Sequence, residues 1–416
     1  MDYLINIFKQ RFSGLFQQNA GSPLKETVLT SNHDQELYDF LSKADDDISK
    51  IDQFGWTPIH RAIQIRNREI IKLLIFKSNG ADLNFTNLKG STPLTYAILV
   101  GNLDIIELLV NSGADINFGD KLGWIPFTRA IDIESIDIVR FLCEKGADLN
   151  REDPKGWTPI VKAVSKDNLE IIRLLIDKGA DVNLSDKYTT PLTKAIRCDK
   201  TESVRLLIEN GTDLNMSDAN GWTPLTAAID CNKSEIVRLL IEKGANPNMI
   251  DPKGWTPMKT AIFKDNLDIL RLLIEIGGDI NFVDTLHWTP LIKAVKTNKI
   301  EAVKVLIANG ANLDLYTGAL YSPLSSAIYI NNFNIIRLLV ETGASLNRHD
   351  GTGNTPFHSA VLHKNMEILT YFQENGANLS SRTKNNKENA IELALKKNQI
   401  TIMKMLLKIT HSIANE

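Results

Sequence analysis

The sequence predicts an all-α solenoid, an elongated fold in which short helix pairs stack one after another. Three observations predict it. Prolines recur about every 33 residues, a glycine recurs on the same period, and between each proline and the next such glycine lie two helical segments rich in apolar residues. A repeat period of roughly 20–50 residues is the signature of solenoids and related arrays. One such unit cannot bury its own apolar surface, so consecutive units are expected to stack.

The first helix of each unit is predicted to begin at the recurring proline. From Pro93 to Pro356 the consecutive spacings are 32 or 33 residues, and most of these prolines follow Thr, as in Thr158-Pro159. Thr is a good helix N-cap, and proline at the first helical position loses no hydrogen bond. Ile125 replaces the capping Thr in one unit, at a cost of roughly 0.5–2 kcal/mol.

A second helix with dense apolar content follows, as in residues 168–178. Its apolar residues go nearly all round the helix, so neighbouring helices must cover it on several sides. It ends at a glycine, here Gly179, where a left-handed backbone conformation is favoured. The connector then carries turn residues, such as Pro154 and Gly156 at the second and fourth positions favoured in a type I turn.

The unit defined by these signals resembles the ankyrin repeat, most clearly in residues 221–248, GWTPLTAAIDCNKSEIVRLLIEKGANPN. The resemblance covers roughly residues 22–408. It implies antiparallel helix pairs joined by hairpin-like loops that project sideways. It also implies a concave surface of loop tips and first helices that usually binds another protein. The family's loop-bracing His, two residues after the proline, is present only at His60 and His358.

We expect about twelve repeats. Residues 1–21 are predicted to form an amphipathic segment, 22–54 a degenerate N-terminal capping repeat, 55–382 ten ankyrin-like repeats, 383–408 a C-terminal capping repeat and 409–416 a tail. Atypical terminal repeats keep a solenoid soluble. The apolar residues of the first segment have helical spacing. That helix is expected to cover the first repeat; a membrane-surface helix or a separate docking peptide is the alternative.

Composition argues against several functional classes. The net charge is −3, from 47 basic and 50 acidic residues, so no global positive field attracts nucleic acid. The three cysteines form no CxxC motif, which fits a reducing compartment such as the cytoplasm. Residues 315–336 are uncharged but contain glycine, proline and asparagines in register with the repeats. No integral membrane span is therefore expected.

No motif in the sequence predicts catalysis. The phosphate-binding GxxxxGK[ST], the nucleophile-elbow GxSxG and the zinc-binding HExxH patterns are all absent. His349, His358 and His363 cluster in one repeat, but no fourth metal ligand accompanies them. We therefore expect no enzyme, no catalytic residue, no metal and no small-molecule cofactor.

One pattern does predict a binding surface. All six tryptophans occupy the position two residues before the recurring proline, and in four of these units a basic residue follows five residues later. Trp and Arg are the residue types most enriched in interface hot spots. The predicted protein-binding residues are Trp56, Arg61, Trp124, Arg129, Trp157, Lys162, Trp222, Trp255, Trp288 and Lys293. Such a stripe suits an extended partner segment with acidic and apolar side chains.

Other interpretations of the chain stay open. Tandem duplication copies a tryptophan whether or not it is used, and the rings can instead pack over neighbouring loops with Lys or Arg stems against them. A bacterial or viral effector that acts on a host protein in the host cytoplasm is a second possibility. A cryptic enzyme that uses a groove or residues 1–21 is a third.

Overall fold

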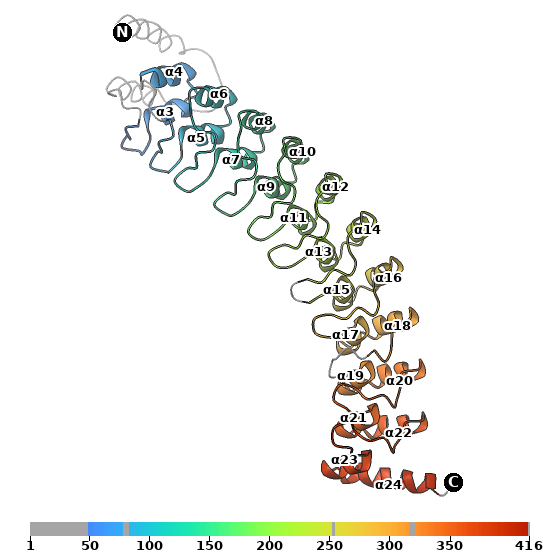
Figure 1. The fold of residues 1–416 in the computed structure, drawn as a ribbon. Coiled ribbons are helices and arrows are strands. Elements are labelled where there is room, and N and C mark those ends of the chain that lie inside the picture. The colour runs from blue at the N-terminus through green and yellow to red at the C-terminus, as the bar shows by residue number, and fades with distance from the viewer. Residues whose placement is uncertain (1–48, 78–82, 252–253, 316–321, 415–416) are drawn as a thin grey trace, which may run out of the picture. The chain divides into compact units, whose positions relative to one another are not determined.

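The computed structural model describes residues 49–77, 83–251, 254–315 and 322–414, with side chains up to residue 408. The chain divides into two compact units, with the boundary between Lys121 and Leu122. The described residues form 22 helices and no strand (Figure 1). The predicted all-α repeat architecture is confirmed.

The first unit contains two described helix pairs. Helix α3 (Pro58–Gln64) pairs with α4 (Arg68–Lys77), and α5 (Pro93–Val100) pairs with α6 (Leu103–Asn111). Helices α3 and α5 also pack against each other.

The second unit repeats this pattern nine times in the part of the chain that the structure describes. Its first helices are α7 (Pro126–Asp132), α9 (Pro159–Lys166), α11 (Pro191–Arg197), α13 (Pro224–Asp230), α15 (Pro257–Phe263), α17 (Pro290–Lys296), α19 (Pro323–Tyr329), α21 (Pro356–Leu362) and α23 (Ala390–Lys396). Its second helices are α8 (Ile136–Glu144), α10 (Leu169–Asp177), α12 (Thr201–Glu209), α14 (Ser234–Glu242), α16 (Leu267–Glu275), α18 (Ile300–Ala308), α20 (Phe333–Glu341), α22 (Met366–Glu374) and α24 (Ile400–Ala414).

The helix boundaries follow the predicted signals. At the start of α9, Pro159 is the first helical residue and the Thr158 side chain accepts a hydrogen bond from Val161 N. The second helix α10 is followed by Gly179, whose φ of +89° lies in the left-handed region. Ile125 makes no side-chain cap hydrogen bond, so α7 lacks the contact that most other first helices have.

Stacking buries the apolar helices as expected. In α10 the side chains of Ile171, Ile172 and Leu175 are completely buried. They are covered because α10 packs against its own partner α9 and against α8 and α12 of the adjacent pairs. Each pair of the second unit thus covers its neighbour's apolar flank.

The loop before each first helix, here called a finger, is a tight turn closed by an aspartate in most repeats. In the second unit the fingers project to one side of the stack, beside the first helices (Figure 1). In the finger before α9, Gly156 N donates to Asp153 O at 2.8 Å. Neighbouring fingers are linked, since Lys187 N donates to Gly156 O at 3.1 Å. The predicted turn at residues 153–156 is present.

Two predictions reach beyond the described residues. The amphipathic segment 1–21 and most of the capping repeat 22–54 lie outside them. The domain boundaries as a whole stay predictions. Among the described helices, none has the length and apolar character needed to cross a bilayer.

Candidate interaction surface

The six tryptophans lie at the ends of their fingers and are half-buried. In five of them the main-chain N–H donates to the carboxylate of the aspartate four residues earlier, at 2.7–3.1 Å. These aspartates are Asp52, Asp153, Asp218, Asp251 and Asp284. The rings are therefore held in place without being sealed inside the stack.

Every indole ring has a cationic side chain within 6 Å of its centroid. The pairs are Trp56 with Arg61 and Lys89, Trp124 with Arg129, Lys155 and Lys162, Trp157 with Lys194, Trp222 with Arg197, Trp255 with Lys293, and Trp288 with Lys293 and Lys296. This is the range in which a ring quadrupole attracts a cation. The predicted tryptophans and basic residues do lie together, although not always in the expected pairs.

Lys162 contacts the tryptophan of the preceding repeat. Its Nζ lies 4.5 Å from the Trp124 ring centroid, and among the described residues the cation over the Trp157 ring is that of Lys194 instead. The side chain is buried and its Nζ lies 2.8 Å from Asp153 and 3.0 Å from Asp132. Lys162 therefore supports the finger and the Trp124 ring and is not free to meet a partner.

Lys293 lies among three aromatic rings. Its Nζ is 4.1 Å from the Trp255 centroid, 5.3 Å from Phe263 and 5.8 Å from Trp288. Burial lowers the pKa of the Lys293 ammonium, while the charge of Asp284 raises it. The side chain is only 9% exposed, so Lys293 too acts chiefly by packing against the tryptophans.

Arg61 and Arg129 are half-buried and remain on the surface. Arg61 forms an ion pair with Asp52 at 2.9 Å and lies over both Trp56 and Phe54. Arg129 stacks at 4.1 Å on Trp124, within its own repeat. These two pairs match the predicted arrangement.

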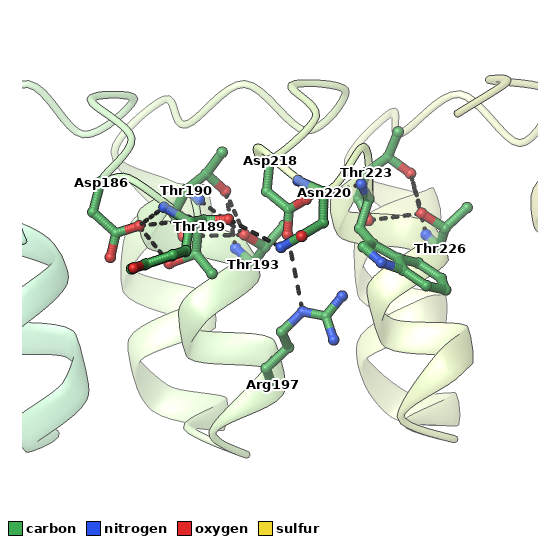
Figure 2. A network of polar contacts seen from close by, with 11 residues as sticks. Asp186, Thr189, Thr190, Thr193, Arg197, Asp218, Asn220, Thr223 and Thr226 are labelled. Carbon is green, nitrogen blue, oxygen red and sulfur yellow. Dashed lines mark hydrogen bonds and ion pairs between the residues drawn. The ribbon is translucent and has the colours of Figure 1, made fainter. Parts of the chain in front are cut away.

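The cation that lies over the Trp222 ring comes from the preceding first helix, α11. Arg197 on α11 lies 5.2 Å from its ring, and Arg197 Nε is 4.0 Å from Asp218 Oδ2. Figure 2 shows this contact between the end of α11 and the finger before α13, next to the threonine hydroxyl pair at the start of α13. The next repeat has Thr260 where a lysine would reach Trp222, and Thr260 is buried. Among the described residues the Trp222 ring therefore has one cation, as the Trp157 and Trp255 rings have, and its cation lies the farthest from the ring of the three.

Sequence reasoning missed Lys259, which replaces the bracing histidine. His60 Nε2 contacts Ser91 O of the next finger at 3.0 Å, and burial lowers the pKa of His60 to about 4, so the ring is neutral. Lys259 Nζ likewise donates to Trp288 O of the next finger and pairs with Asp284 at 2.7 Å. Its register, two residues after the proline, was the available signal. Burial lowers the pKa of Lys259 to about 8.

The described residues show no sign of a metal or redox centre. They contain no group of three or more His, Cys, Asp or Glu side chains that could hold a metal ion. Cys143, Cys198 and Cys231 carry free thiols. The surface consists of aromatic rings, cations and hydrogen-bonding loops, which are the means of binding another macromolecule.

Known proteins share the repeats of this chain. The solved structures that match include the ankyrin repeat domain of Bcl-3, a member of the IκB protein family. It is 27% identical and covers 52% of this chain and 98% of that domain, with a TM-score of 0.49. No curated protein matches the chain. The family model for three-copy ankyrin repeats matches residues 27–120, 112–186, 130–218, 183–251, 258–350 and 324–415.

These matches span nearly the whole chain, in the register of the helix pairs seen in the structure. Ankyrin repeats are general protein–protein interaction modules. The chain belongs to the ankyrin-repeat family.

Proposed function

We propose that this protein is a non-enzymatic scaffold that binds a partner protein through its fingers and first helices. The supporting observation is that all six tryptophans share one finger position and are only partly buried there. Trp combines a large apolar area with few rotatable bonds, so it contributes contact area at low entropic cost.

The tryptophans are preorganised for binding. The Asp251 carboxylate fixes the main chain of Trp255 at 2.7 Å, and Lys293 and Phe263 support its ring. A partner would meet side chains that have already lost most of their freedom, which reduces the ordering cost of association. Within the predicted site, the tryptophans, Arg61 and Arg129 are the contact residues, and Lys162 and Lys293 position them.

The free thiols of the described cysteines suit a reducing compartment. We therefore place the proposed function in the cytoplasm, or in a host cytoplasm if the protein is delivered there.

The test replaces Trp157, Trp222 and Trp255 by Ala together. We expect this variant to lose most of the proteins that the wild type captures in a pulldown read by mass spectrometry. It should keep most of its far-UV helical signal, because the second helices and their buried contacts are untouched. The matched control replaces the exposed Arg173, Arg238 and Arg271 of the same repeats and should capture the same proteins as the wild type.

The two readings of the tryptophans give different results in this experiment. Binding lost with helicity retained supports a contact role. Equal loss of binding and helicity, or unchanged binding, shows that the rings only pack against the fingers.

A further inference from the structure

Some cations of the finger surface form ion pairs with a finger aspartate, and others do not. Arg61, Lys162 and Lys259 each form an ion pair with a finger aspartate, at 2.7–2.9 Å. Their charge is used inside the protein. Lys155, Lys187 and Lys194 differ, because within the described residues no carboxylate lies within ion-pair distance of any of them.

These three lysines lie on two neighbouring fingers and one first helix. Lys155 and Lys187 occupy adjacent fingers, since a Cβ built on Gly156 would lie only 3.0 Å from Lys187 Cβ. Lys194 lies in the same repeat as Lys187, on α11, with its Nζ 4.6 Å from the Trp157 ring. The Lys155 ammonium lies 5.8 Å from the Trp124 ring, so the three uncompensated charges are spread over two neighbouring repeats, beside Trp124 and Trp157.

Aromatic surface accompanies the charge. Tyr188, next to Lys187 on the same finger, is 50% exposed, and the Lys187 ammonium lies 5.5 Å from its ring. Three acids lie on these fingers: Asp153 and Asp186 are buried and hold the finger turns, and Glu152 approaches to 3.8 Å of a Cβ built on Gly156. None of them lies within ion-pair distance of the three lysines in the described part of the chain. Lys155, Lys187 and Lys194 together with Trp157 and Tyr188 form a surface that we call the triple-lysine patch.

We propose that the triple-lysine patch binds an acidic, extended segment of the partner protein. This inference rests on the proposed function and adds the partner's chemistry and the place where it docks. Uncompensated lysines attract carboxylates and set the register of an interface. The exposed rings receive the apolar side chains between them.

The repeat spacing predicts the spacing of the acids. Stacked helices lie about 8–10 Å apart, and an extended chain advances about 3.3–3.6 Å per residue. A segment that runs across the fingers therefore passes one repeat in about two to three residues. Carboxylates are expected at about every second or third position, with apolar residues between them.

The test is a selection of random twelve-residue peptides displayed on phage, against the full chain. We expect enriched peptides with acidic residues at about every second or third position. The charge-reversed variant Lys155→Glu/Lys187→Glu should bind them at least roughly tenfold more weakly at physiological salt, because like charges across an interface are strongly unfavourable. The control Lys178→Glu/Lys243→Glu makes the same charge change at exposed residues after second helices and should bind like the wild type.

Each other outcome is decisive. Enriched peptides that need Trp157 and Trp222 but are neutral would overturn the acidic-partner inference and leave the proposed function standing. No enrichment, with no loss of partners by the tryptophan variant in the pulldown, would overturn both. Tighter binding of a single-stranded oligonucleotide than of the acidic peptides, lost in the charge-reversed variant, would assign the patch to nucleic acid instead.

Discussion

In the finger before α9 the buried carboxylate of Asp153 meets a lysine, whereas in the finger before α21 the equivalent Asp350 does not. Lys162 lies three residues after its proline and reaches Asp153 at 2.8 Å. At the same position of the later repeat stands Ser359, and among the described residues Asp350 Oδ2 has no hydrogen-bond partner. The other carboxylate oxygen, Oδ1, holds the turn of the finger, since it accepts hydrogen bonds from Thr352 N at 2.9 Å and from Asn354 N at 3.3 Å.

The comparison shows why basic residues recur on the finger surface. A finger buries a carboxylate to hold its own turn, and a buried charge is costly unless it is paired. A lysine or arginine from the first helix supplies the pair and lies against a tryptophan at the same time. The cations whose charge is left for an acidic partner are therefore those without such a pair, such as Lys155 and Lys187, whereas Arg61 can still offer its surface to a partner.

The largest expected effect comes from breaking the buried ion pair between Lys162 and Asp153. Lys162→Met leaves the buried Asp153 without its cation and removes the partner of Asp132. We expect a loss of about 3–5 kcal/mol in local stability, measured by native-state hydrogen exchange of the α9 and α10 amides.

The matched control for that variant is Lys166→Met, one turn further along α9. Lys166 pairs with Glu134 at 3.6 Å, and both side chains are substantially exposed, so the change should cost under about 1 kcal/mol. Equal effects of the two variants would contradict the distinction between finger and surface ion pairs.

The second effect is a change of stability with pH, and it concerns the finger before α17. The buried Asp284 of that finger is paired with Lys259 of the preceding repeat. Burial lowers the pKa of Lys259 from 10.5 to about 8. Between pH 8 and 10.5 the unfolded chain therefore holds a proton that the folded chain has lost, so this group makes stability rise with pH. The rise is on the order of 3 kcal/mol.

This contribution is measured as the difference between wild type and Lys259→Met in urea unfolding at each pH, monitored by hydrogen exchange of α15 and α17. The wild type should gain stability relative to the variant across that window. A constant difference would show that Lys259 keeps its ordinary pKa in the fold.

The third effect comes from giving the buried Asp350 the cation that Asp153 already has. Ser359→Lys places a lysine beside Asp350, as Lys162 stands beside Asp153, and should stabilise the α21 repeat by roughly 1–3 kcal/mol. Thermal unfolding followed by circular dichroism measures the gain. The double variant Ser359→Lys/Asp350→Asn should lack it, and a gain retained there would mean that the lysine stabilises through its stem alone.

The smallest effect is expected for charges away from the fingers. Arg205 on α12 pairs with Glu235 on α14 at 2.5 Å, with side chains 40% and 72% exposed. Glu235→Gln should change the free energy of unfolding by less than about 1 kcal/mol, and less still at high salt. A larger change in urea unfolding would mean that the outer ion pairs hold the repeats together.

Much of this architecture is predictable from the sequence because the repeat period repeats each signal many times. Thr-Pro steps, the glycines after second helices and the apolar positions all indicate the same helix pair. The shared position of the tryptophans is equally visible. Ile125 was also identified correctly as a start without a side-chain cap.

The pairing within the site could not be predicted in the same way. Trp157 and Lys162 are five residues apart, yet Lys162 lies against Trp124 because its side chain leans toward the preceding repeat. That offset depends on how far successive first helices are displaced across the stack, which a one-dimensional pattern does not contain. The bracing role of Lys259 is hidden for the same reason, since its acceptor belongs to the next finger.

Hydrogen–deuterium exchange of the free protein and of its complex with the captured partner shows whether the fingers bind that partner. We predict that binding slows exchange in the fingers at residues 153–157, 186–189 and 218–222 and in the first helices α9 and α11. Protection confined to the second helices, or exchange that is the same in the free and bound protein at these fingers, would contradict it.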